Sequence, residues 1–339
     1  MSNGRVRVTI GNILITILNF FVVVIPILIS VAYLTLLERK ILGYSQLRKG
    51  PNVVGLYGIL QPLADGVKLF SKEMVIPSHA NLALYVIAPI LALIMGFLPW
   101  FLFPWGGYKY GFCMNHPYSL LFILAILSVG IFGVLLSGWS SSSKYAFLGS
   151  IRAVAQMISY EVSLSIILMG VIITTGSLNV SFIFSIQAFV GYFFISLWPL
   201  ALIYFVSMLA ETNRAPFDLS EGESELVSGY NVEYSSMAFA LFFLAEYSHI
   251  IFSSFLFIIL FAGGYLNIFK PGILELSTNL ILLVVKGTIV CGIFIWVRTS
   301  FPRLRYDQVM SLCWKQFLPI SISTLWAINI LLWGFNIPI

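Results

Sequence analysis

The sequence has few charged residues. Asp, Glu, Lys and Arg make up 9% of its 339 residues, whereas soluble chains typically carry about 25%. Hydrophobic residues make up 60%. This balance excludes a soluble globule. We therefore expect an all-α polytopic membrane protein that forms a single integral membrane domain over residues 1–339, with an amphipathic helix at the interface and a structured acidic loop.

Cysteine is also scarce. Cys113, Cys291 and Cys313 lie far apart and form no CxxC pair, so they provide no disulfide framework and no iron–sulfur or zinc ligand set. Flavin, haem and nucleotide fingerprints are not visible either. We expect no metal site and no redox centre in this chain, so any redox chemistry belongs to another subunit. The net charge of +5 does not indicate nucleic acid, because the bases lie at the ends of apolar runs.

Eight apolar runs are long enough to cross a bilayer, which takes about 20 residues each. A loop over residues 176–188 is expected to join the fourth and fifth. The first run, interrupted by Pro26, is too long for a signal-peptide core, and no Arg/Ser-rich leader precedes it. We therefore expect synthesis in the compartment that holds the membrane. The predicted spans are about 10–37, 82–103, 118–136, 151–175, 189–209, 235–265, 279–297 and 317–335.

A stretch between the first two spans predicts a helix that lies in the headgroup plane, at about residues 56–73. Asp65, Lys68 and Lys72 fall on one side of this helix. A helix with one apolar and one charged face is typical of the membrane interface. The apolar residues at helical spacing are Leu56, Ile59, Leu60, Leu63, Val67 and Phe70.

Lysine and arginine predict the orientation. Thirteen bases fall on one face of the predicted topology and four on the other, and the richer face is the inner one. Both termini are therefore expected on the outer side. The inner bases are Arg39, Lys40, Arg48, Lys49, Lys68, Lys72, Lys144, Arg152, Arg214, Arg298, Arg303, Arg305 and Lys315; the outer ones are Arg5, Arg7, Lys109 and Lys270.

Six of the thirteen acids lie in residues 211–234, beside a single base, Arg214. Capping-box spacing between Ser220 and Glu223 predicts a short helix over about 221–227. A solvated loop is one interpretation. The other is a proton relay, because crowded carboxylates against apolar walls cannot all be ionised. The six acids are Glu211, Asp218, Glu221, Glu223, Glu225 and Glu233.

Glu161, Glu246 and Lys286 fall inside predicted spans. Each costs about 2.5–3.5 kcal/mol unless it is paired or faces water. They either fix helix packing as buried pairs or mark a hydrated path, and we expect a carboxylate partner for Lys286. His249 shares a helical face with Glu246, but the two are too few ligands for a metal. We expect His249 to be a hydrogen-bonded core residue.

Four long blocks, at residues 36–73, 138–164, 210–247 and 295–319, resemble subunit 1 of respiratory NADH–ubiquinone oxidoreductase (complex I). The blocks are similar to the mitochondrial form and occur in the family's order. The resemblance implies a core membrane subunit that forms much of the ubiquinone access tunnel and couples quinone reduction to proton translocation. It also implies the mitochondrial inner membrane, with both termini in the intermembrane space, or alternatively a bacterial plasma membrane.

The resemblance further implies roles for individual residues and for partners. Ubiquinone would be the substrate, while NADH, FMN and iron–sulfur clusters belong to partner subunits. The partners would be other complex I membrane subunits, the quinone-module subunits of the hydrophilic arm and membrane lipids. Tunnel and mouth residues would be Arg39, Arg48, Asp65, Phe243 and Arg298; coupling carboxylates would be Glu161, Glu211, Asp218, Glu221, Glu223, Glu225 and Glu246.

Two other classes remain open from the residues alone. An autonomous cation or proton transporter would also carry intramembrane carboxylates and a lysine, but it should show repeats and paired broken helices. A purely structural anchor for a soluble arm would not need buried charges.

Overall fold

The computed structural model describes residues 10–105, 116–219, 229–266 and 276–334, and these residues form helices and connecting segments without a β-strand. The predicted all-helical architecture is therefore confirmed for this part of the chain. The elements are α1 (Ile10–Ser45), η1 (Leu56–Gly58), α2 (Gln61–Ser71), α3 (Leu82–Phe97), η2 (Leu98–Leu102), α4 (Ser119–Ser140), α5 (Lys144–Thr175), α6 (Val180–Val190), α7 (Phe193–Ser196), α8 (Trp198–Glu211), η3 (Gly229–Asn231), α10 (Ser236–Leu260), α11 (Leu276–Ser300), α12 (Tyr306–Leu312), the π-helical η4 (Cys313–Phe317) and α13 (Leu318–Gly334).

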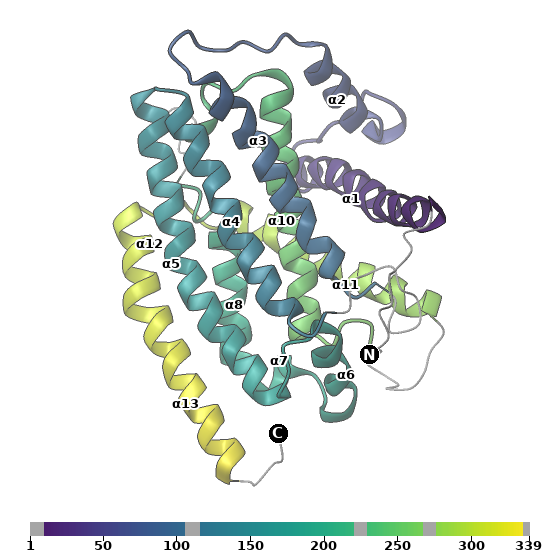
Figure 1. The fold of residues 1–339 in the computed structure, drawn as a ribbon, viewed down its shortest axis with the longest axis vertical. Helices are drawn as coiled ribbons and strands as arrows, with labels where there is room; N and C mark the ends of the chain where they lie inside the picture. Colours follow the sequence, from purple (N-terminus) through teal and green to yellow (C-terminus); the bar gives the residue numbers. More distant parts are fainter. Residues whose placement is uncertain (1–9, 106–115, 220–228, 267–275, 335–339) are drawn as a thin grey trace.

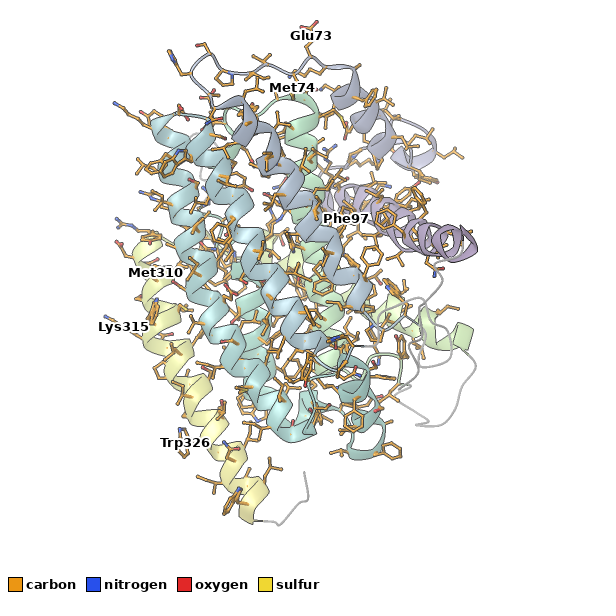
Figure 2. The ribbon with its side chains drawn as sticks, viewed as in Figure 1. Glu73, Met74, Phe97, Met310, Lys315 and Trp326 are labelled. Carbon is orange, nitrogen blue, oxygen red and sulfur yellow. The ribbon has the colours of Figure 1, made fainter. Side chains whose placement is uncertain are left out.

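Helix α10 lies at the centre of the bundle. It packs against α3, α11 and α1, and α4 and α5 extend the bundle on one side, while α1 is strongly tilted (Figure 1). Of an apolar stretch of 18 residues within α10, 78% are buried, whereas in the corresponding stretch of the segment from α12 to α13 only 6% are buried. Lys315 and Trp326 on that segment point away from the bundle, whereas Phe97 lies within it (Figure 2).

Small residues allow the central helices to approach closely, as is usual where lipid provides no hydrophobic drive between helices. A Cβ on Gly96 of α3 would lie 2.7 Å from Ser248 Oγ of α10. A Cβ on Gly149 of α5 would lie 2.7 Å from the Cα of Gly229. The second contact holds η3, where the predicted acidic loop ends, against α5.

Seven helices among the described residues are long and apolar enough to cross a membrane. The exception to the expected pattern is the fifth span, predicted as one helix over residues 189–209. The structure divides it: Gly191, with φ 102°, ends α6, and Pro199 stands in the first turn of α8. Proline favours a helix start because it has no N–H to leave unpaired.

The prediction of a loop at residues 176–188 was also wrong, because the helix α6 covers most of these residues. Asn179 caps this helix, with its Oδ1 accepting a hydrogen bond from Ser181 N over 3.0 Å. Gln187 then ties α6 to the end of α10, since its Nε2 donates to the carbonyls of Ile259 and Leu260 over 2.8 and 3.0 Å. The helix has 11 residues, too few to cross alone.

Two helix ends differ from the prediction. Helix α1 continues to Ser45 through its charged end and through Gly43, and the backbone leaves the helix just beyond it, where Leu47 has φ 57°. The last helical segment begins at Tyr306 rather than near 317. Its π-helical part lies before Pro319, which cannot donate to the carbonyl four residues earlier, and a shifted hydrogen-bond ladder accommodates that loss.

Candidate functional site

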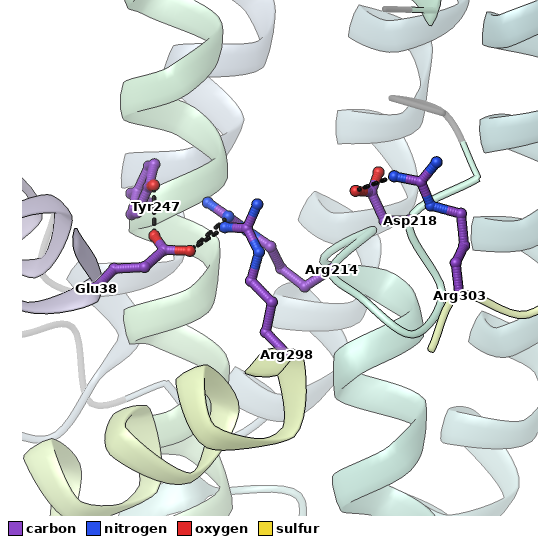
Figure 3. Close-up of polar contacts among 6 residues, drawn as sticks. All are labelled: Glu38, Arg214, Asp218, Tyr247, Arg298 and Arg303. Carbon is purple, nitrogen blue, oxygen red and sulfur yellow. Dashed lines mark hydrogen bonds and ion pairs between the residues drawn. The ribbon is translucent and has the colours of Figure 1, made fainter. Parts of the chain in front are cut away.

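Three side chains from different elements donate to Glu38, which is buried near the end of α1 (Figure 3). Arg214 Nη1 donates to Oε1 over 3.1 Å, and Arg298 donates to the same oxygen. The Tyr247 hydroxyl donates to Oε2 over 2.6 Å. These four residues are called the Glu38 cluster; they join α1, the segment after α8, α10 and α11.

The Glu38 cluster contains two guanidinium groups and one carboxylate, so it carries an excess positive charge. Burial by itself lowers the pKa of Arg214, but Glu38, Tyr247 and Glu246 outweigh that effect, and the pKa is raised. Arg214 therefore stays charged. Its Nη2 is buried with no hydrogen-bond partner among the described residues. A ligand oxygen at this point would satisfy a costly open donor.

A larger hollow of about 390 Å³, called the lateral groove, lies between α1, α10 and α11. Its walls are mainly aliphatic and aromatic side chains. Leu34 and Cys291 line both this groove and the small cavity of about 20 Å³ at the Glu38 cluster, so the two adjoin. The lining residues of the groove are Pro26, Ile27, Ser30, Tyr33, Leu34, Leu37, Trp100, Trp105, Ile251, Phe255, Val284, Gly287, Thr288 and Cys291.

A separate cavity of about 70 Å³, called the carboxylate cavity, lies among α3, α4, α5, α8 and α10. Glu211 and Glu246, both predicted coupling residues, line it together with His249. The Tyr230 hydroxyl donates to Glu246. Glu161 on α5 lies close enough to Glu211 for their charges to repel. The structure thus brings three of the predicted carboxylates into one neighbourhood.

Gln156 on α5 holds the segment that follows α8. Its Nε2 donates to the carbonyls of Ala210 and Phe217, each over 2.9 Å. This segment carries Arg214 and Asp218, and Asp218 accepts a hydrogen bond from Arg303 over 3.3 Å. The buried amide therefore fixes the backbone that places one charge in the Glu38 cluster and another at Arg303.

The structure does not bring the five predicted mouth residues together. Arg39 at the end of α1 and Asp65 on α2 form an ion pair of 2.7 Å, with both side chains partly exposed. Arg298 belongs to the Glu38 cluster. Arg48 is exposed, with its Nε donating to Gln46, and does not join that cluster. Phe243 on α10 is partly buried one turn before Tyr247.

The expected carboxylate partner of Lys286 is not among its described contacts. Its Nζ donates instead to the carbonyls of Ala262, Gly264 and Leu266, over 3.0, 3.1 and 2.9 Å, and lies 5.5 Å from the centroid of the Tyr192 ring. These carbonyls lie beyond the end of α10 at Leu260, and an ammonium group, which has three donors, can satisfy all three at once. Lys286 thus holds the segment that follows α10.

His249 differs from its prediction as well. It is partly buried and lines the carboxylate cavity, but it has no hydrogen-bond partner among the described residues. In the same part of the chain, no group of three or more His, Cys, Asp or Glu side chains could hold a metal ion. Glu221, Glu223, Glu225 and the short helix predicted over 221–227 lie outside the described residues.

Sequence reasoning missed Glu38, Tyr247 and Tyr230 as site residues. Glu38 could have been found, because it stands at the end of the first apolar run, beside Arg39 and Lys40. An acid at that depth needs a partner. The two tyrosines carry no comparable signal. Tyr247 is an uncharged residue within the apolar α10, and Tyr230 precedes that helix, where tyrosine is common at membrane interfaces.

These features define a class: an all-helical membrane protein with a buried charge cluster beside an apolar groove and a second set of carboxylates in its core. The family model described as NADH dehydrogenase matches residues 18–329. The chain belongs to this family and is a membrane subunit of an oxidoreductase enzyme complex.

Three relatives illustrate the similarity. The NADH-ubiquinone oxidoreductase chain 1 of Metridium senile is 55% identical, covering 94% of each chain. That of Chondrus crispus is 48% identical over 94% of this chain and 97% of its own. An NADH-quinone oxidoreductase subunit of the bacterium Paramagnetospirillum magneticum is 49% identical over 95% of this chain and 93% of its own. Mitochondrial and bacterial forms are thus similar to this chain to nearly the same extent.

Proposed function

We propose that this chain forms the membrane access path of a quinone to the complex and couples its reduction to proton movement. The observation that carries the proposal is the lateral groove, whose lining meets the Glu38 cluster at Leu34 and Cys291. An apolar groove suits an isoprenoid tail. The charged end offers donors for the carbonyl oxygens of a quinone ring.

The buried donors suit that role. Arg214 Nη2 has no partner among the described residues, and Arg298 shares the single carboxylate Glu38 with it. Reduction to the quinol takes up two electrons and two protons. We assign the electrons to iron–sulfur clusters in partner subunits, together with FMN and the NADH site. Arg214 and Arg298 stabilise negative charge that develops on the ring before the protons arrive.

Carboxylates deeper in the bundle respond to that charge. Glu246 interacts electrostatically with both Arg214 and Glu38, and Glu211 lines the same cavity as Glu246. A change of charge at the Glu38 cluster therefore alters the free energy needed to ionise the carboxylates that line the carboxylate cavity. Glu161 and Asp218 belong to this coupling system in the proposal, together with Glu221, Glu223 and Glu225.

We also propose how the chain is arranged in the membrane. Residues 1–339 form one integral domain with eight crossings, the fifth made by the broken segment from α6 to α8. Helix α2 lies at the interface, since Leu63, Val67 and Phe70 are exposed. We assign the chain to the mitochondrial inner membrane, with its termini in the intermembrane space. Its partners are other membrane subunits and the quinone-module subunits of the hydrophilic arm.

A blocked groove tests the access path. Thr288 on α11 lines the groove and is exposed, so Thr288→Trp fills it without displacing core atoms. The neighbouring Ile289 is exposed but is not a lining residue, so Ile289→Trp is the matched control. We expect Thr288→Trp to slow NADH oxidation by a long-tailed quinone about tenfold, with little effect on a hydrophilic acceptor of the soluble arm. Equal rates in both variants would refute the path.

A further inference from the structure

One polar group of the carboxylate cavity has no role in the mechanism above. His249 lies one turn after Glu246 on α10, and both side chains line the cavity that Glu211 also lines. The chain has three histidines. His79 and His116 lie in the loops before α3 and α4, so His249 is the one inside the bundle.

A neutral imidazole carries one N–H donor and one acceptor nitrogen, and leaving both unpaired in an apolar span costs free energy. His249 has no hydrogen-bond partner among the described residues, but the cavity it faces measures about 70 Å³. One water needs roughly 10–15 Å³ of such space, so the cavity has room for water. Water can therefore join the ring to the carboxylates on the other walls.

The ionisable groups around the ring come from several elements. On its own helix it faces Glu246 and Ser253; from α8 and the segment after it come Tyr204, Glu211, Thr212 and Asn213; from η3 comes Tyr230. The lining residues of α3, α4 and α5 are uncharged, with Glu161 beyond them near Glu211 and Arg214 near Glu246. The ionisable groups of the lining itself are thus two carboxylates, two phenols and this one imidazole.

We propose that His249 is a third proton-holding group of the carboxylate cavity, which exchanges a proton with Glu246 and Glu211 through cavity water. The exchange turns a carboxylic acid and a neutral imidazole into a carboxylate and an imidazolium, so the net charge of the cavity does not change. When quinone reduction draws protons from this region, the imidazolium offsets one of two carboxylate charges that would otherwise repel across a low-dielectric space. This inference rests on the proposed coupling function.

The test uses the intact complex in its native membranes. Infrared difference spectra are recorded on reduction by NADH in the presence of quinone, with and without ¹⁵N-labelled histidine. We expect imidazole bands that shift with the label, disappear in His249→Gln and persist in His79→Gln. If the wild-type complex shows no labelled band that depends on His249, the inference is wrong, whether or not a variant assembles.

Kinetics separate the two proposals. His249→Gln should slow quinone-dependent NADH oxidation about tenfold, less than the loss of a direct general acid, because cavity water remains. It should also remove one ionisation from the pH profile, while oxidation by a hydrophilic acceptor stays unchanged. A normal His249→Gln beside an impaired Glu246→Gln overturns the role of His249 and leaves the coupling function standing. A normal Glu246→Gln overturns the coupling function itself.

Discussion

The guanidinium of Arg214 lies over the ring of Tyr247, with 4.5 Å between its central carbon and the ring centroid. Such a contact contributes about 2 kcal/mol when it is desolvated. Tyr247 also donates to Glu38, which Arg214 contacts too. Each member of this triangle therefore orients the other two. Through them α1, α10 and the segment that follows α8 are fixed relative to one another.

Removing the shared carboxylate should be costly. Glu38→Gln removes the carboxylate that Arg214 and Arg298 share, and we expect a loss of about 3 kcal/mol in stability. The value is at the low end for a broken buried pair, because the Arg298 side chain is 32% exposed. The measurement is the midpoint of thermal dissociation of the detergent-solubilised complex.

Asp65→Asn provides the comparison for Glu38→Gln. It breaks the more exposed ion pair with Arg39, for which we expect a change of about 0–1 kcal/mol. Equal effects of the two substitutions on the dissociation midpoint would show that the Glu38 cluster does not stabilise the bundle.

Lys286→Met should loosen the segment that follows α10. Three carbonyls, of Ala262, Gly264 and Leu266, lose their shared donor. We expect a loss of about 2–4 kcal/mol, seen as a lower dissociation midpoint and faster proteolysis of the segment after α10. Lys68→Met, at an exposed position on α2, is the control and should have no effect. An unchanged midpoint for Lys286→Met would show that these three hydrogen bonds do not stabilise the segment.

Charge on the exposed face of α2 should impair quinone entry without unfolding the chain. Leu63 and Val67 are 62% and 69% exposed, so an aspartate there removes no core packing. The charged carboxylate would, however, make it unfavourable for this face of α2 to lie against the acyl chains of the lipid. We expect Leu63→Asp or Val67→Asp to slow oxidation with long-tailed quinones about tenfold and with short soluble analogues less than about twofold.

Ala64→Asp is the control for this helix, since Ala64 is exposed on the side of Lys68. It should have little effect on either class of quinone. If the Leu63 and Val67 variants lose activity equally with long and short quinones, the defect is one of folding and the interfacial role of α2 is wrong.

A methyl group at Gly149 should disturb the carboxylate cavity from a distance. Its Cβ would meet the Cα of Gly229 at 2.7 Å, which pushes η3 and Tyr230 away from Glu246. We expect Gly149→Ala to cost about 1–3 kcal/mol and to reduce quinone-dependent activity. Gly292→Ala on α11 is the matched control, because a Cβ there meets nothing within 4 Å and Gly292 does not line the cavity. Similar behaviour of both variants would refute the role of this contact.

The sequence by itself determined that this is a membrane protein, where most of its membrane-crossing segments lie, and which charged residues fall within them. These follow from apolar runs and from the cost of charge in lipid, both of which are local properties. It also named Arg39 and Asp65, which the structure joins as an ion pair, and Glu211 and Glu246, which share a cavity.

Only the tertiary structure decided which charges meet. Glu38 and Arg298 are 260 residues apart, and Lys286 contacts carbonyls rather than a carboxylate. Partner choice depends on how each helix is tilted and rotated against its neighbours, and no local pattern encodes that. The break before α8 and the π-helical turn at Cys313–Phe317 depend on the same packing, because a broken hydrogen-bond ladder persists only where neighbouring groups compensate for it.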